Sequence, residues 1–356
     1  MSEEQILKSI DLLKNQIRLT ESQNLKKKYL NDIVVLLGYL SQTYGIELDP
    51  EVTLNDALYA DYVYNFERDL FIEEGELLSI NPITEVLANQ TLETYEKSKF
   101  YPYTIPENRG VDSNYYNELI LNFVSSLGDN VYKKYVGLFK DGVLVMPMGP
   151  KYAGGCWDFP TMDKQSICVG TLGFDLYPVL AHELGHAVHF DALNKIGRRR
   201  LSASVFVESL STIYELLFLD YLEKNNIDIN NRLRDFYYTF LKMCIKVKTY
   251  LRIHELDEID LNEVKIDTDS ELIKSYYETM LDGEVELDFF EDSSYFYGAL
   301  AALSILDKTN DPKEAANEML QFLLKSEVKN YMECLKDLGI DEKIPNGLEK
   351  NLKRIR

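Results

Sequence analysis

One stretch of sequence says most about the fold and chemistry of this chain: Leu180-Ala181-His182-Glu183-Leu184-Gly185-His186-Ala187-Val188-His189. Residues four apart in a helix lie one turn above each other, so His182 and His186 present their imidazoles from one face. Two neutral imidazoles at that separation can share one zinc ion. Glu183 lies one position round the helix, where it can take a proton from a zinc-polarised water that attacks a peptide carbonyl.

Chance does not account well for this motif. The chain has four histidines, and three of them fall within the eight residues from His182 to His189. The same helix has an apolar back face, which includes Leu184 and Val188, as a helix packed on a protein core requires. His189 could be taken for a further ligand, but four protein ligands would close a catalytic zinc site. We therefore expect His189 to be structural.

A catalytic zinc site needs a third protein ligand. The metzincin pattern would require a glycine at position 189 and a histidine at 192, where this chain has His189 and Ala192. A glutamate from a following helix is the other arrangement, and residues 204–215 offer Glu208 and Glu215. The surroundings of Glu208 are apolar, and a bound cation would offset the cost of burying its carboxylate there. Glu215 lies two turns further on the same face and could accept a hydrogen bond from a ligand histidine, although either glutamate could also be a solvated helix charge.

The rest of the chain predicts mostly helices. Apolar positions recur every three or four residues through residues 1–100. We expect a β-hairpin over residues 135–146, with a turn at Asp141-Gly142, and a further strand at residues 165–169. The predicted fold class is mainly α, with a small β-sheet preceding the HExxH helix.

A segment with two prolines and a glycine, residues 102–111, is the best candidate for a domain boundary. It divides the chain into an N-terminal helical lobe, residues 1–110, and a catalytic zinc-peptidase domain, residues 111–356.

Composition limits the partners and the location. The chain has 38 Lys+Arg against 59 Asp+Glu, a formal net charge of -21, which disfavours nucleic acid and anionic membranes as partners. There is no pattern of a signal peptide and no apolar run long enough to span a bilayer. Four scattered cysteines without a CxxC pair suit free thiols in a reducing compartment. We expect a cytoplasmic protein that acts on peptides, and the composition does not determine its oligomeric state.

The sequence resembles the thimet oligopeptidase and oligoendopeptidase F family of zinc metallopeptidases. The resemblance rests on the HExxH stretch, on Phe206-Val207-Glu208-Ser209-Leu210-Ser211, and on Lys151-Tyr152-Ala153-Gly154-Gly155-Cys156. It implies a shortened gluzincin with a helical, cleft-containing fold, in which Glu208 joins the two histidines on one zinc ion. The activity that it implies is endopeptidase cleavage of short peptides.

Two features depart from this family. Its members are usually longer, so we expect this chain to lack part of the helical lobe that walls their channel. The family also stabilises the tetrahedral oxyanion with a histidine and tyrosines from a late segment. The matching segment here, residues 289–299, has Tyr295 and Tyr297 but no histidine. The resemblance implies that these two tyrosines donate to the oxyanion.

Three possibilities stay open at this point. Arg198-Arg199-Arg200 could grip a substrate carboxylate or be a solvated loop. The strand at residues 166–169 could pair with an extended substrate along its edge. The absent late histidine also leaves an alternative function, a peptide-binding or regulatory protein that retains zinc but has little activity.

Overall fold

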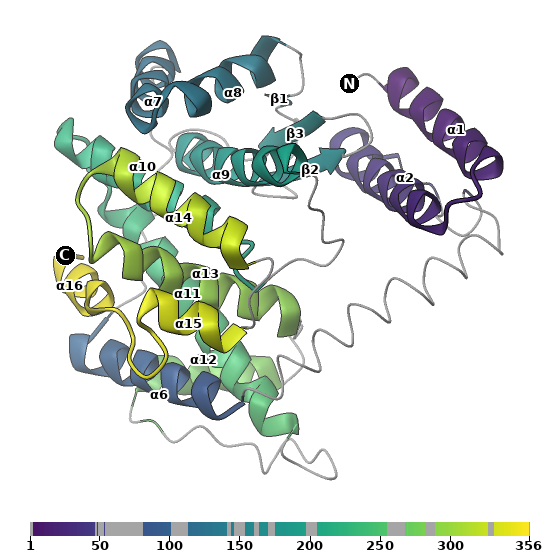
Figure 1. Ribbon diagram of the computed structural model, residues 1–356. Helices are drawn as coiled ribbons and strands as arrows, with labels where there is room; N and C mark the ends of the chain where they lie inside the picture. The colour runs from purple at the N-terminus through teal and green to yellow at the C-terminus, as the bar shows by residue number, and fades with distance from the viewer. Residues whose placement is uncertain are drawn as a thin grey trace. The chain divides into compact units, whose positions relative to one another are not determined.

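The computed structural model has the mainly helical architecture that the sequence predicts, with one small sheet before the HExxH helix (Figure 1). The structure describes residues 3–46, 48, 53, 81–100, 113–140, 144–145, 154–159, 164–169, 175–196, 205–254, 268, 270–281, 289–326 and 331–355. The predicted boundary at residues 102–111 and the three arginines at 198–200 lie outside the described residues. No helix in the described part of the chain is long and apolar enough to cross a membrane.

Residue contacts divide the chain into two compact units, each built from two stretches of sequence. Unit 1 comprises residues 1–73 and 109–202, and unit 2 comprises residues 74–108 and 203–356. One of the crossings between the units falls between residues 108 and 109, inside the predicted boundary segment. The assignment of a separate N-terminal lobe and catalytic domain stays a prediction.

Unit 1 begins with a helical hairpin formed by α1 (Glu3–Leu19) and α2 (Gln23–Tyr44). The apolar stripe of α1 is buried against α2, as its three- and four-residue spacing predicts. Ser22 caps the start of α2 by accepting from the backbone of Leu25, and Gly45 ends the helix with a left-handed φ of 67°. These two capping residues mark where α2 begins and where it ends.

The region predicted as a hairpin is partly helical. Tyr135 lies in α8 (Asp129–Lys140), which follows α7 (Ser113–Leu127), so the prediction of a strand at 135–139 is wrong. Tyr135 and Leu138 are buried three residues apart, which is a helical spacing, and Asp129 and Lys140 carry the charges that the helix dipole favours at its two ends. A short run of alternating apolar and polar residues at the end of a helix has the same sequence pattern as a strand, which explains the wrong prediction.

The sheet of unit 1 has three strands, β1 (Leu144–Val145), β2 (Gly154–Phe159) and β3 (Lys164–Val169). Their order is β1-β3-β2, with β3 parallel to β1 and antiparallel to β2. The strand expected at residues 165–169 is therefore confirmed, but it is the central strand. Because β3 pairs on both sides, the prediction that it offers an edge to substrate is wrong; β2 lies at the edge of the described sheet.

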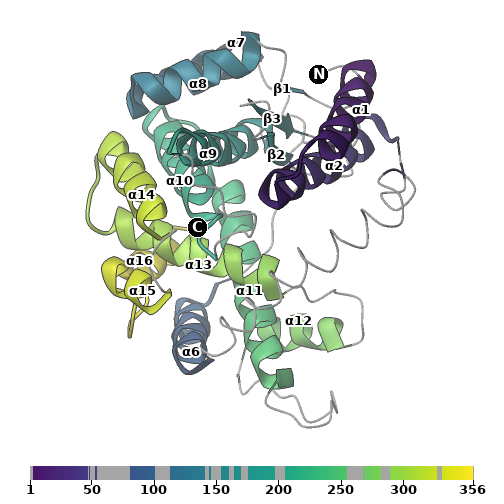
Figure 2. The same ribbon diagram turned by 45° about the vertical axis from the view of Figure 1, so that its right-hand side comes forward.

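The motif helix of unit 1, α9 (Leu176–Lys195), packs against β2 and β3. Figure 2 shows it running beside these two strands. The opposite face of β2 carries Trp157, whose ring meets Tyr39 of α2 edge-on at a centroid distance of 5.3 Å. Thus β2 lies between α9 and the α1–α2 hairpin.

Unit 2 is helical throughout its described residues. Its helices are α6 (Asn81–Ser98), α10 (Ser209–Lys224), α11 (Asn230–His254), α12 (Glu271–Leu281), α13 (Phe289–Leu306), α14 (Pro312–Ser326), α15 (Tyr331–Leu338) and α16 (Asn346–Arg354). The apolar α13 packs against both α10 and α11, and α6 packs against α11. A tight link at residues 225–229 joins α10 to α11, with Asn226 in the left-handed region at φ 61°. Contact with α13 holds α10 against the core of unit 2.

Candidate metal centre

The two motif histidines lie side by side on α9. Their ring centroids are 5.2 Å apart, with ring planes inclined by 69°. His186 is buried at 8% exposure, and His182 is half-buried. The helical spacing therefore brings two imidazoles together at a face of α9, as the sequence predicts.

Glu183 lies on the side of α9 that meets β2. It is only 6% exposed. A methyl group built on Gly154 of β2 would come within 2.7 Å of its Oε1 atom, so the strand backbone passes directly beside the carboxylate. Cys156 is the next β2 residue on the same face. Burial raises the pKa of the Cys156 thiol, and the negative charge of Glu183 raises it further.

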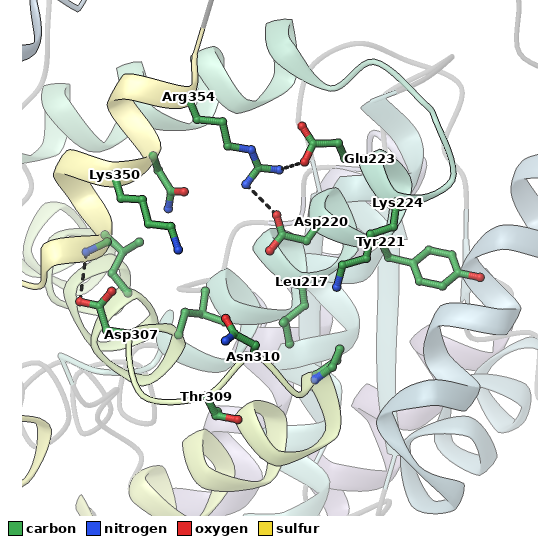
Figure 3. Close-up of a pocket in the computed structure, with 15 residues that line it drawn as sticks. Leu217, Asp220, Tyr221, Glu223, Lys224, Asp307, Thr309, Asn310, Lys350 and Arg354 are labelled. Atoms are coloured by element: carbon green, nitrogen blue, oxygen red, sulfur yellow. Dashed lines mark hydrogen bonds and ion pairs between the residues drawn. The ribbon is translucent and has the colours of Figure 1, made fainter.

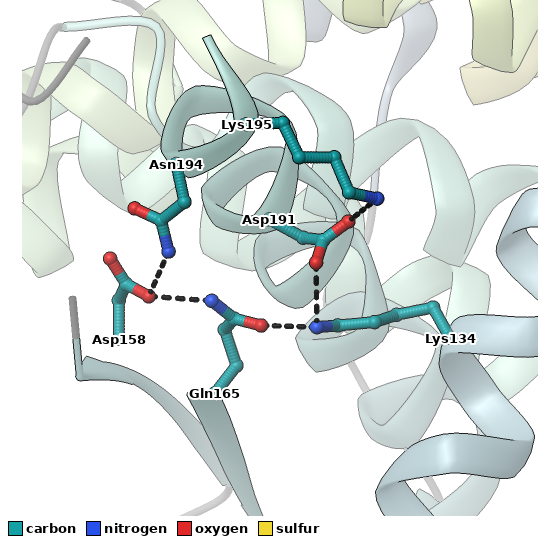
Figure 4. A network of polar contacts seen from close by, with 6 residues as sticks. All are labelled: Lys134, Asp158, Gln165, Asp191, Asn194 and Lys195. Atoms are coloured by element: carbon teal, nitrogen blue, oxygen red, sulfur yellow. Dashed lines mark hydrogen bonds and ion pairs between the residues drawn. The ribbon is translucent and has the colours of Figure 1, made fainter. Parts of the chain in front are cut away.

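A polar network fixes the C-terminal half of α9 to the sheet and to α8 (Figure 4). Lys134 of α8 donates to Gln165 of β3 and to Asp191 of α9, the latter at 3.1 Å. Asp158 of β2 accepts from Gln165 at 2.6 Å and from Asn194 of α9 at 2.9 Å. Four elements of unit 1 are therefore connected through one chain of hydrogen bonds, which sets the angle of the motif helix on the sheet.

The electrostatics of this network favour an ionised Asp191. Burial alone would raise its pKa, but hydrogen bonds from Lys195 and Lys134 and the charges of these two lysines hold the pKa below the ordinary value. The carboxylate is thus a charged anchor for both lysines.

His189 is buried at 2% exposure. Its ring and that of Phe190 are nearly parallel, with centroids 5.8 Å apart, and the Phe190 ring lies at 6.0 Å from that of His186 at the same inclination of 16°. These contacts are compatible with the structural role expected of His189, which stays a prediction.

In unit 2, Glu208 immediately precedes α10 and is 9% exposed. Its backbone carbonyl accepts the first helical hydrogen bond, from Thr212, at 2.9 Å. The Ser211 hydroxyl lies 2.8 Å from that carbonyl oxygen and 3.1 Å from Glu208 Oε2, so its proton can be donated to either. Phe206 anchors the turn by meeting Phe322 of α14 edge-on, with centroids 5.1 Å apart. Ser211 has a direct contact with the carboxylate that our sequence reasoning did not assign to it.

Glu215 is also buried, at 4% exposure, in the middle of α10. Its Oε1 atom accepts from Arg232 of α11 at 2.7 Å, and Arg232 also pairs with Asp235 at 3.2 Å. Burial of both Glu208 and Glu215 shows that neither is a solvated helix charge. A hydrogen bond from a ligand histidine to Glu215 stays a prediction.

The late segment forms the N-terminal half of α13, which packs on α10. A methyl group built on Gly298 would lie 2.7 Å from Glu208 Cβ. Tyr295 is half-buried and lies three residues before Gly298, on the same side of the helix. Tyr297 is buried at 2% exposure, and its hydroxyl shares a 2.6 Å hydrogen bond with Thr84 of α6. The role of either tyrosine as an oxyanion donor stays a prediction.

A cavity of about 520 Å³ in unit 2 lies at the opposite end of α10 from Glu208 (Figure 3). Arg354 spans part of it by pairing with Asp220 and Glu223. None of the residues that the sequence predicts for the site lines this cavity. It is therefore separate from the Glu208 turn.

Comparison with known proteins supports the fold. No protein-family model matches the chain, and no curated protein matches it. The structure is similar to that of a candidate oligoendopeptidase F from Bacillus anthracis str. Ames, with a TM-score of 0.50 and 14% identity over 93% of this chain and 60% of the other. A candidate peptidase from Chlamydophila abortus is similar at a TM-score of 0.49 and 16% identity, over 99% of this chain and 63% of that one. The chain thus spans less than two thirds of either protein, and the similarity shows a fold of the oligoendopeptidase type.

Proposed function

We propose that this protein is a zinc-dependent endopeptidase or oligopeptidase whose single zinc ion is bound by His182, His186 and Glu208. The observation that carries the proposal is the pair of imidazoles side by side on α9, next to a buried glutamate. Two imidazoles and one carboxylate are the ligand set of many catalytic zinc sites, which keep one position open. Glu208, the third proposed ligand, is buried at the start of α10, where a bound cation would offset the cost of burying its carboxylate.

The residues then take distinct roles in peptide hydrolysis. A bound zinc ion supplies Lewis acidity that polarises a water molecule and the scissile carbonyl. Glu183 accepts the proton of the attacking water and passes it to the leaving amine. The Ser211 hydroxyl orients the carboxylate of Glu208 by donating a hydrogen bond to its Oε2 atom. Tyr295 and Tyr297 are the candidates for hydrogen bonds to the oxyanion.

Peptides are the substrate class that fits these groups. The edge strand β2 can add an extended peptide by backbone hydrogen bonds, which tolerate many sequences. A net charge of -21 opposes nucleic acid and anionic lipid as partners, and we propose the cytoplasm as the location. Cys156, Cys244 and Cys334 are free thiols, as a reducing compartment would maintain them.

The proposal is tested by incubating the protein with a mixed-sequence peptide pool and identifying the products by mass spectrometry. Internal cleavages should disappear with a zinc chelator and return when zinc is restored. The cut positions would also separate an endopeptidase from an exopeptidase.

Binding without cleavage would favour the alternative function, a zinc-retaining peptide-binding or regulatory protein. In that case the zinc-loaded protein would retain peptides from the pool and release them unchanged. Cleavage that persists at full rate after complete removal of zinc would contradict both functions.

A further inference from the structure

In each unit, one glycine lies directly against a glutamate of the proposed centre: Gly154 against the side chain of Glu183, and Gly298 against Cβ and the backbone of Glu208. A Cβ atom on Gly154 would lie 2.7 Å from Oε1 and 3.1 Å from Cγ of Glu183, and 2.6 Å from Cγ1 of Val179. A Cβ atom on Gly298 would lie 2.7 Å from Cβ, 2.9 Å from the carbonyl carbon and 3.2 Å from the carbonyl oxygen of Glu208. Distances below 3.0 Å between such atoms require something to move.

Backbone conformation does not explain either glycine. The described glycines with positive φ are Gly45, Gly128 and Gly339. Gly154 lies within strand β2 and Gly298 within helix α13, and a glycine in such a position destabilises the element relative to alanine. Close approach of another group is then the physical reason for a glycine in an element interior.

We propose that Gly154 and Gly298 are positioning residues. Because they have no side chain, they leave room for Glu183 and Glu208 to take the positions that zinc-dependent hydrolysis requires. This inference rests on the proposed function and deepens it. Gly154 lets the edge strand pass close enough to confine the Glu183 side chain to one place beside α9. Gly298 lets α13 approach the backbone at the start of α10, so the Glu208 turn is held by a neighbouring helix.

The two contacts differ in what can yield. At Gly154 the two nearest atoms are Cγ1 of the β-branched Val179, at 2.6 Å, and Oε1 at the end of the flexible Glu183 side chain, at 2.7 Å, so an added methyl displaces the Glu183 carboxylate more readily. At Gly298 the obstructing atoms are Cβ of Glu208, which no side-chain rotation can move, and the Glu208 carbonyl group, so an added methyl shifts α13 or the first turn of α10. The first change should affect proton transfer, and the second should affect metal binding.

The Gly154→Ala variant tests the first position. We expect kcat to fall roughly 10–100-fold, because a displaced base loses alignment with the attacking water, while KM and zinc affinity stay unchanged. The matched control is Gly155→Ala, which adds the same methyl group on the opposite face of the same strand, where it meets the Trp157 ring at 2.8 Å and so causes a similar clash away from Glu183. Combining Gly154→Ala with Val179→Ala makes room on the other side of the methyl and should restore part of kcat.

The Gly298→Ala variant tests the second position. We expect zinc affinity, measured by competition with a chelating dye, to fall roughly 10–100-fold, as for other residues that orient a metal ligand. The control is Gly347→Ala, which adds a methyl in unit 2 beside Asp307 and away from Glu208. Equal zinc affinity for Gly298→Ala and the wild type would overturn the role of Gly298.

Failure of this inference can be separated from failure of the proposed function. If the wild type cleaves peptides with zinc but Gly154→Ala and Gly155→Ala have the same kcat, the inference is wrong and the function stands. If the wild type neither binds zinc nor cleaves, the function fails, and a double-mutant cycle of thermal unfolding still decides the contact. Gly154→Ala should then destabilise the protein less in a Glu183→Ala background, and additive effects would overturn the contact.

Discussion

At the scale of the residue, the main feature is that two carboxylates, those of Glu183 and Glu208, are buried. Glu183 lies in the HExxH motif, and Glu208 lies in the stretch expected to supply the third zinc ligand. A buried carboxylate is costly unless a hydrogen bond, a positive charge or a metal ion compensates for lost hydration. Ser211 provides one hydrogen bond to Glu208. These two glutamates could be predicted from sequence because the motif and its apolar surroundings mark them. Ser211 lies three residues after Glu208, a helical spacing that could have indicated its contact. Gly154 and Gly298 could not be predicted, because their importance lies in distances between elements.

Ser211→Ala removes the hydroxyl that lies 3.1 Å from Glu208 Oε2. We expect zinc affinity to fall about tenfold, since the ligand carboxylate loses the group that orients it. Competition with a chelating dye measures the effect. Ser209→Ala, at a buried serine two positions earlier in α10, is the control and should bind zinc as the wild type does. An identical loss in both variants would mean that general disturbance of α10 is the cause.

The thiol of Cys156 reports the charge of Glu183. Burial and that charge raise the pKa of the thiol, so little reactive thiolate exists at neutral pH. Glu183→Gln should lower the pKa and accelerate alkylation of Cys156, measured by mass spectrometry in chelator-treated protein at constant pH. Glu118→Gln neutralises an exposed glutamate of α7 and should leave the rate unchanged. A slower reaction in Glu183→Gln would contradict the proximity of the two groups.

At the scale of the element, prediction from sequence succeeded where the pattern was long. The helical hairpin at the N-terminus follows from its periodic apolar positions and the capping residues of α2, and α9 follows from the HExxH motif that it carries. Prediction from sequence failed at residues 135–139, because five residues are too few to distinguish the end of a helix from a strand. The position of β3 in the middle of the sheet could not be predicted either, because strand order is set by pairing between distant segments.

Lys134→Met should loosen α9 from the sheet. The ammonium group that bridges Gln165 and Asp191 is lost while most of the side-chain volume is kept, and we expect a loss of roughly 1–3 kcal/mol of stability. Chemical denaturation at neutral pH measures it. Lys133→Met, at the exposed neighbouring lysine, should change stability little.

The stability lost in Lys134→Met should depend on pH, and the direction of this dependence follows from the pKa of Asp191. Its pKa is lowered in the folded protein, so its contribution to stability is complete above its unfolded pKa of roughly 4. That contribution is lost as the pH falls through the lower folded pKa. Lys134→Met brings the folded pKa closer to the unfolded one, so the difference in stability from the wild type should shrink on acidification below about pH 4. A difference that grows on acidification would contradict this assignment.

At the scale of the whole molecule, the proposed ligands come from two stretches of the chain that belong to different compact units. The sequence could indicate both stretches by resemblance, and the comparison of structures supports the fold that the resemblance implies. The chain spans 60% of the length of that similar structure, so a length limit on substrates does not follow from it.

Zinc should stabilise the whole folded protein, because an ion that binds only the folded state shifts the unfolding equilibrium. At a free zinc concentration about 100 times the dissociation constant, the expected gain is about 2.7 kcal/mol. Thermal unfolding with buffered zinc measures it. The shift should vanish in His186→Ala and persist in His254→Ala, which replaces the one histidine outside the motif. A shift of equal size in both variants would show that zinc binds elsewhere.

The most direct test of the central claim is the turnover number of Glu183→Gln, measured on a cleaved peptide after zinc content has been matched to the wild type. The amide keeps the shape of the side chain but cannot accept the proton of the attacking water. We predict a fall in kcat of roughly 10²–10⁴-fold with one bound zinc ion retained, and unchanged turnover for the control Glu118→Gln. Wild-type turnover by zinc-loaded Glu183→Gln would contradict the role of Glu183 as the general base and, with it, the proposed active site.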